Sequence, residues 1–155
     1  MIKINVITNN INWLKYIKNP NSYLDRKINK LNFKNKQFTK KKLFCTLLLS
    51  SNNKIKSLNK KFRKKNKSTD VLSFPFYTKK ELKKEIKNKK KIYIGDIIIN
   101  INKIKNKSNL KKFKNRFDRL WIHGLIHLFG YDHKKDKDFF EMDRIEKKYF
   151  NMIND

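Results

Sequence analysis

Short apolar runs separated by polar stretches limit the folds open to this chain of 155 residues. Residues 2–8, 42–50 and 92–100 are rich in Ile, Val and Leu and have the length of strands. The segment S-T-D-V-L-S-F-P-F at 68–76 predicts a fourth strand. Because Pro75 cannot donate a hydrogen bond to a neighbouring strand, this one is expected at a sheet edge or at a bulge. The chain therefore predicts a small sheet of about four strands.

The segments between these runs predict four helices. The first covers 20–31, a short second one begins after a cap at Ser51 or Asn52, the third covers 110–129 and the fourth begins at Asp138. Gly130 fits the end of the longest one, and Glu141 would complete a capping box with Asp138. The expected buried positions are Ile55, Leu58, Phe62, Phe113, Phe117, Leu120, Trp121, Gly124, Leu128, Met142, Ile145, Tyr149 and Ile153. The alternation predicts an α/β fold: one compact domain over residues 1–155, with a mixed sheet packed against helices.

The charge of the chain is extreme, since 41 Lys and Arg residues against 13 Asp and Glu residues give +28. One interpretation is a polyanionic partner, with RNA or a ribosome the obvious candidate. The other is compositional drift, because Lys, Asn and Ile crowd the chain as codon use in an AT-rich genome would produce. The charged insert 78–91 predicts a solvated helix or loop, and an RNA-contacting arm is the less favoured interpretation.

The composition also indicates where the protein works. Cys45 is the single cysteine, and its apolar surroundings favour a buried thiol in a reducing cytosol. No run approaches the roughly 18 consecutive apolar residues of a membrane span, and the first residues resemble a strand rather than a signal peptide. We therefore expect a cytoplasmic protein, a monomer without a membrane partner.

The three histidines of the chain all lie in the segment H-G-L-I-H-L-F-G-Y-D-H. His123 and His127 are four residues apart on the expected helix, so their rings project from one face and can bind one ion. His133 follows the turn at Gly130 and can supply a third ligand. Three imidazoles leave a tetrahedral position open for water, as in catalytic zinc sites. The pattern predicts one zinc ion on the long helix and the turn after it.

The same spacing occurs in the metzincin proteases, where a glutamate follows the first histidine and acts as the base. Here Gly124 occupies that position. Glycine cannot take a proton, and in a helix interior it costs about 1 kcal/mol relative to alanine. We interpret Gly124 as a point where another element or the substrate approaches the helix closely. Peptide hydrolysis by the metzincin mechanism is therefore disfavoured.

Together with S-T-D-V-L-S-F-P-F, I-G-D-I-I-I and a C-terminal E-M-x-x-x-E, the histidine segment resembles the YbeY family of bacterial endoribonucleases. The resemblance runs from about Lys42 to Glu146. It implies a zinc-dependent, single-strand-specific endoribonuclease acting in 16S ribosomal RNA 3′-end maturation and in ribosome quality control. Ribosomal RNA and the ribosome are the implied partners.

The resemblance also assigns roles to individual residues. Arg63 matches the functionally important arginine of the family, and a guanidinium there could hold a phosphodiester and stabilise developing charge. Asp96, after Gly95, matches a strand aspartate that could orient a zinc ligand or a water, or could instead hold a bulge. Ser73 and Asp70 match the family motif, and Ser73 is expected to bind substrate. Asp70 could simply begin the strand.

Other residues near these motifs have less specific interpretations. Asp132 could bond a histidine ring or cap the following turn, with the structural role favoured. Phe74, Phe76 and Tyr77 could stack on bases, although burial of at least two of them is the safer expectation. Trp121 is expected in the core.

Two further functions remain open at this point. A metal-dependent peptide or amide hydrolase is favoured by the histidine spacing and opposed by Gly124. A non-catalytic ribosome-binding protein with a structural zinc is opposed by the lack of a fourth protein ligand.

Overall fold

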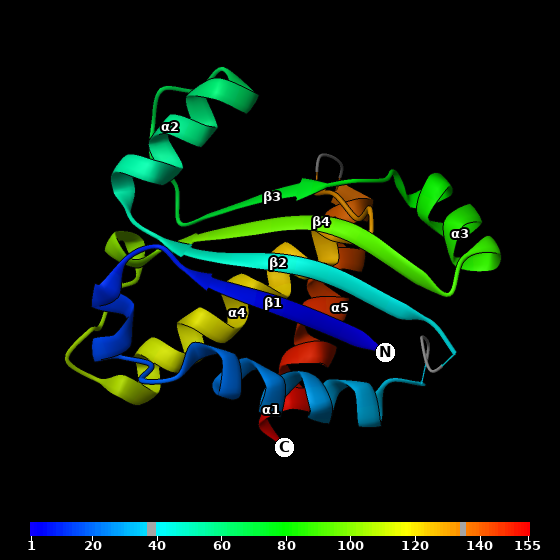
Figure 1. Ribbon diagram of the computed structural model, residues 1–155, viewed down its shortest axis with the longest axis horizontal. Coiled ribbons are helices and arrows are strands. Elements are labelled where there is room, and N and C mark those ends of the chain that lie inside the picture. The colour runs from blue at the N-terminus through cyan, green and yellow to red at the C-terminus, as the bar shows by residue number, and fades with distance from the viewer. Residues whose placement is uncertain (37–39, 134–135) are drawn as a thin grey trace.

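A four-stranded sheet in the order β1-β2-β4-β3 forms the centre of the computed structural model, which describes residues 1–36, 40–133 and 136–155 (Figure 1). The strands are β1 (Ile2–Thr8), β2 (Lys42–Ser50), β3 (Val71–Pro75) and β4 (Lys91–Asn100). β1, β2 and β4 are parallel, and β3 pairs with β4 in the antiparallel direction. The mixed sheet is confirmed, and Pro75 lies at the end of an edge strand as expected.

Helices cover the two faces of this sheet unequally (Figure 1). They are α1 (Pro20–Lys34), α2 (Asn52–Arg63), α3 (Lys79–Asn88), α4 (Leu110–Leu128) and α5 (Asp136–Asn154), with short 3-10 turns at Ile11–Lys15 and Ile101–Lys103. The main core joins α1, α4 and α5 to the inner face of the sheet. A smaller cluster on the outer face contains Ile55 of α2, Leu72 and Ile98. Within the described residues no helix is long and apolar enough to cross a membrane.

Two helix predictions need correction. Helix α5 begins at Asp136, so Asp138 lies inside its first turn and the capping box at Asp138 and Glu141 is wrong. Both aspartates place negative charge at the helix N-terminus, where the helix dipole favours it. On α2, Ile55 is buried and Leu58 half-buried, but Phe62 is 58 % exposed because the helix covers only the end of the outer face.

The charged insert is the helix α3. Thr78 and Glu81 form a capping box at its start: the Thr78 hydroxyl accepts from the Glu81 amide, and the Glu81 carboxylate accepts from the Thr78 amide. Most of its side chains are exposed, but Leu82 is buried in the main core. The buried Leu82, the half-buried Ile86 and the capping box hold this lysine-rich segment in place.

A bulge in β4 decides which side chains face which helices. Phe44 of β2 pairs with Tyr93, whereas the next residue, Cys45, pairs with Gly95. Ile94 is therefore the extra residue, and the alternation of the strand reverses after it. The bulge considered at this position is therefore present. The Cβ of any larger residue at Gly95 would lie 2.2 Å from the Phe74 carbonyl oxygen, so β3 approaches β4 closely there.

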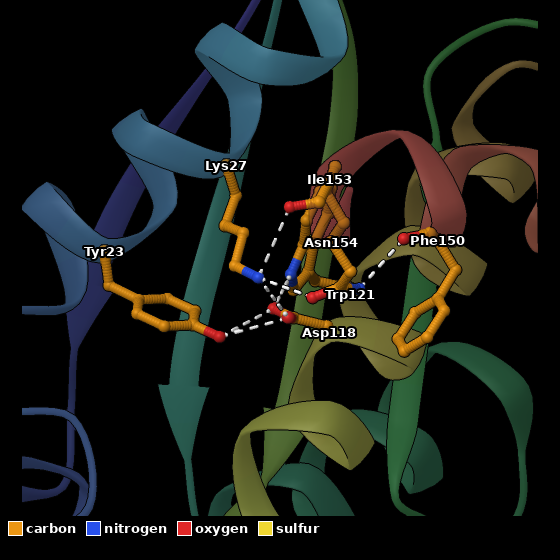
Figure 2. A network of polar contacts seen from close by, with 7 residues as sticks. All are labelled: Tyr23, Lys27, Asp118, Trp121, Phe150, Ile153 and Asn154. Atoms are coloured by element: carbon orange, nitrogen blue, oxygen red, sulfur yellow. Dashed lines mark hydrogen bonds and ion pairs between the residues drawn. The ribbon is translucent and has the colours of Figure 1, made fainter. Parts of the chain in front are cut away.

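A buried polar network fixes α4 against α1 and α5 (Figure 2). The Asp118 carboxylate accepts from the Tyr23 hydroxyl at 3.0 Å and from Trp121 Nε1 at 3.0 Å, and pairs with Lys27 Nζ at 3.2 Å. Lys27 also donates to Asn154 Oδ1 of α5 at 2.7 Å. Burial raises the pKa of Asp118, and the bonds from Trp121, Lys27 and Tyr23 oppose that rise. The network anchors the half of α4 that precedes the histidines.

Candidate metal centre

The three histidines meet at the C-terminal end of α4. His123 and His127 lie one turn apart on the helix, and their Nε2 atoms are 3.1 Å from each other. Gly130 reverses the chain with a φ of +82°, a conformation that glycine adopts without strain. The ring of His133 then lies 5.1 Å from that of His127, measured between ring centroids. The predicted cluster is confirmed.

Both helical histidines are held through their other ring nitrogen. Nδ1 of His123 lies 2.7 Å from a Glu146 carboxylate oxygen of α5, and Nδ1 of His127 lies 2.9 Å from the Tyr131 carbonyl oxygen. Both partners only accept, so each Nδ1 carries the hydrogen and each Nε2 presents a lone pair. Carboxylate and carbonyl partners of this kind orient metal-binding histidines. The sequence alone did not assign this role to Glu146.

The arrangement suits a cation. Two lone pairs 3.1 Å apart repel each other unless a proton or a metal ion lies between them. Burial lowers the pKa of His127, and the neighbouring His123 lowers it further, so a shared proton is disfavoured. Tetrahedral zinc with bonds of about 2.0–2.1 Å separates its nitrogen ligands by about 3.3 Å. One nitrogen from each histidine lies within 4.8 Å of the other two, so a small adjustment closes the site.

A cleft of about 810 Å³ opens beside the histidines, and Arg63, Ser73, His127 and His133 all contribute to its wall. Arg63 is the last residue of α2, and its Nη2 donates to the Ser73 carbonyl oxygen at 3.2 Å. Ser73 faces α4 because it pairs with Ile97 on the inner face of the sheet. The structure thus places Arg63 and Ser73 at the same cleft as the histidines, although both lie far from the histidines in the sequence.

The hydroxyl of Ser73 is buried beneath α4 and has no hydrogen-bond partner among the described residues. A Cβ on Gly124 would lie 2.6 Å from Ile97 Cγ2 and 3.1 Å from the Ser73 hydroxyl oxygen. Gly124 therefore lets the helix approach the sheet, as its sequence position suggested. A glutamate at this position would have no room.

Asp96 does not reach the histidines. The bulge at Ile94 turns it to the outer face, where it pairs with Thr46 and accepts a hydrogen bond from the Tyr93 hydroxyl. The expected contact with a zinc ligand is therefore wrong, and the alternative of a carboxylate at a bulge describes the structure. The carboxylate that contacts a histidine is that of Glu146.

The remaining acidic residues of the motifs have local roles. Asp132 accepts a hydrogen bond from the His133 amide at 2.8 Å. Asp70 accepts from the Val71 amide at the start of β3, and Arg116 of α4 pairs with it at 2.8 Å. The structural interpretations of both residues are supported.

The aromatic prediction was wrong in part. Phe74 and Tyr77 are half-buried and Phe76 is 68 % exposed, so none of the three is fully buried. Phe74 packs against the outer cluster and Tyr77 against the main core, whereas the Phe76 ring lies near the surface against the ring of Tyr93. Trp121 and Cys45 are buried as expected, and burial raises the pKa of the Cys45 thiol to about 12.

Comparisons with known proteins identify the family of this chain. The family described as Endoribonuclease YbeY matches residues 7–154. A protein named Endoribonuclease YbeY from Pelagibacter ubique is 44 % identical over 99 % of this chain and 97 % of its own. One with the same name from Thermodesulfovibrio yellowstonii is 34 % identical over 83 % of this chain and 76 % of its own.

The fold comparison points the same way. A protein of known solution structure from Thermotoga maritima superposes with a TM-score of 0.59 at 27 % identity, covering 99 % of this chain and 89 % of the other. Sequence, fold and the histidine cluster agree, and the chain belongs to the YbeY endoribonuclease family.

Proposed function

We propose that this protein is a zinc-dependent, single-strand-specific endoribonuclease. Its substrate would be ribosomal RNA, and it would act in 16S ribosomal RNA 3′-end maturation and in ribosome quality control. It would work in the cytoplasm as a monomer. Membership of a family of endoribonucleases supports the activity. The observation that carries the metal dependence is the pair of lone pairs on His123 and His127, oriented through Glu146 and Tyr131.

The roles of the residues follow from their positions. A zinc ion held by the three histidines would polarise the phosphodiester and lower the pKa of a bound water to about 7. Arg63 would hold a phosphate oxygen, since a guanidinium has five N–H donors and the Ser73 carbonyl uses one of them. Ser73 would act on the substrate through its carbonyl oxygen, which holds the Arg63 guanidinium at the cleft, because its hydroxyl is buried beneath α4. Asp96 has no part in this proposal.

The residues of the site do not support peptide hydrolysis by the metzincin mechanism. That chemistry needs a glutamate where Gly124 packs against Ile97 and Ser73. A purely structural zinc is disfavoured too, because three histidine ligands, two of which line the open cleft, leave one coordination position for water or substrate.

The test is cleavage of matched single-stranded and double-stranded RNA. We expect cleavage of the single strand, loss of activity with a chelator, and a fall of about 100-fold in kcat/KM for Arg63→Gln. Lys60→Gln removes one positive charge from an exposed position on the same helix and serves as the control. Equal activity of both variants, or cleavage that a chelator leaves intact, would reject the proposal.

A further inference from the structure

A second hollow of about 260 Å³ lies next to the metal cleft, between α3, α5 and the turn at Phe129–Tyr131. Its floor is apolar, and four cations line it: Lys79, Lys83, Arg144 and Lys148. Among the described residues of its wall, Glu141 is the one that carries a carboxylate. We call this hollow the α3–α5 groove.

Three of the four cations of the groove have no carboxylate partner among the described residues. Glu141 pairs with Lys79 at 3.6 Å. Within the parts of the chain that the structure describes, Lys83, Arg144 and Lys148 form no ion pair with a carboxylate. Exposed lysines occur all over this chain, so charge alone would not single out the groove. What distinguishes it is a concave shape with an apolar floor, in which several unpaired cations converge.

The groove is joined to the metal cleft by two shared residues, Lys79 and Tyr131. Lys79 Nζ lies 3.9 Å from the centre of the Tyr131 ring, and the Tyr131 carbonyl oxygen holds Nδ1 of His127. A Cβ on Gly130 would lie 2.5 Å from the Lys79 amide nitrogen, so the turn and the start of α3 are in direct contact. The groove therefore has a fixed position relative to the metal ligands.

We propose that the α3–α5 groove binds the single-stranded RNA on one side of the cleaved bond, with its cations on the phosphates and its apolar floor under a base. The inference rests on the proposed function and adds the path of the substrate. Phosphates fit because they supply the missing negative charge at regular intervals along a chain that must also pass the metal. The RNA would pass from the metal cleft into the groove at Lys79 and Tyr131.

The test compares single-stranded oligonucleotides of about 4 and about 12 nucleotides, within the range of single-strand site sizes. Affinity is measured by fluorescence anisotropy with 2′-O-methylated RNA, at several salt concentrations. In the triple variant Lys83→Gln, Arg144→Gln, Lys148→Gln, we expect the preference for the long oligonucleotide to fall at least tenfold. The slope of log affinity against log salt should fall by about 2, from three contacts at about 0.7 each.

The control is Lys103→Gln, Lys105→Gln, Lys112→Gln, which removes the same charge near the start of α4, at the opposite end of the molecule (Figure 1). Its preference for the long oligonucleotide should equal that of the unaltered protein. If the two triple variants lowered the preference for the long oligonucleotide equally, RNA would be attracted to the basic surface in general, and the proposal that the groove binds RNA would be wrong.

The two proposals fail in different ways. If the unaltered protein cleaves single-stranded RNA but the groove variant keeps its full preference for the long oligonucleotide, the proposed role of the groove is wrong and the proposed nuclease activity is retained. If the unaltered protein neither cleaves nor binds single-stranded RNA, both proposals are wrong.

Discussion

Replacing Gly124 by alanine tests how the helix that carries the metal ligands is seated on the sheet. Alanine is favoured over glycine by about 1 kcal/mol in a helix interior. Against this, the new Cβ would lie 2.6 Å from Ile97 Cγ2 and 3.2 Å from Ile97 Cδ1, where carbon atoms normally approach to about 3.5–4.0 Å. Overpacking of this kind costs about 1–3 kcal/mol. The net expectation is a loss of up to about 2 kcal/mol.

The assay is urea unfolding, with a double-mutant cycle against Ile97→Ala. Removing the Ile97 side chain opens space for the new Cβ, so Gly124→Ala should become stabilising in that background, with a coupling energy of about 1–3 kcal/mol. Asn115→Ala, at an exposed position of the same helix, gives the effect of helix propensity alone. If Gly124→Ala stabilises the protein as Asn115→Ala does, and shows no coupling to Ile97, the argument for close packing is refuted.

Three further variants test separate parts of the structure. Glu146→Ala should weaken zinc affinity by about 10–100-fold in competition with a chromophoric chelator, because His123 loses the partner that orients it; Asp143→Ala, the same charge change on the same helix, should not. Asp118→Ala should lower the free energy of unfolding by about 3–5 kcal/mol, because the half-buried Lys27 loses its counter-charge and the buried Tyr23 and Trp121 lose their hydrogen-bond acceptor; a loss below 1 kcal/mol would contradict the role of the network. Ser73→Ala should raise the free energy of unfolding by about 1 kcal/mol and leave RNA binding unchanged, because the hydroxyl that it removes is buried without a hydrogen-bond partner among the described residues; a loss of stability, or weaker RNA binding, would contradict this.

The sequence predicted those features that depend on local spacing. His123 and His127 share a face because four residues make about one helical turn, and Gly130 provides the reversal that returns His133. The strands β1 and β2 match the expected ranges 2–8 and 42–50. Pro75 correctly indicated an edge strand, since an interior strand would need its missing N–H.

The sequence failed where a contact depends on how separate elements pack. Strict alternation from Ile92 would place Asp96 on the inner face with Ile94, but the bulge reverses the order and sends Asp96 outward. Glu146 meets His123 across 23 residues, through the packing of α5 on α4, which no local pattern specifies. Phe76 matched an apolar motif, but it follows the last residue of β3 and its side chain is largely exposed beside the Tyr93 ring of β4.

We propose that one metal ion, held by His123, His127 and His133, makes this protein cleave single-stranded RNA. The most direct test is a titration of metal-free protein with zinc, following bound metal and RNA cleavage in the same samples. We expect cleavage to rise in proportion to bound zinc and to saturate near one ion per chain, and we expect folded His127→Ala protein to stay inactive throughout. Full cleavage by the metal-free protein, or by His127→Ala, would contradict it.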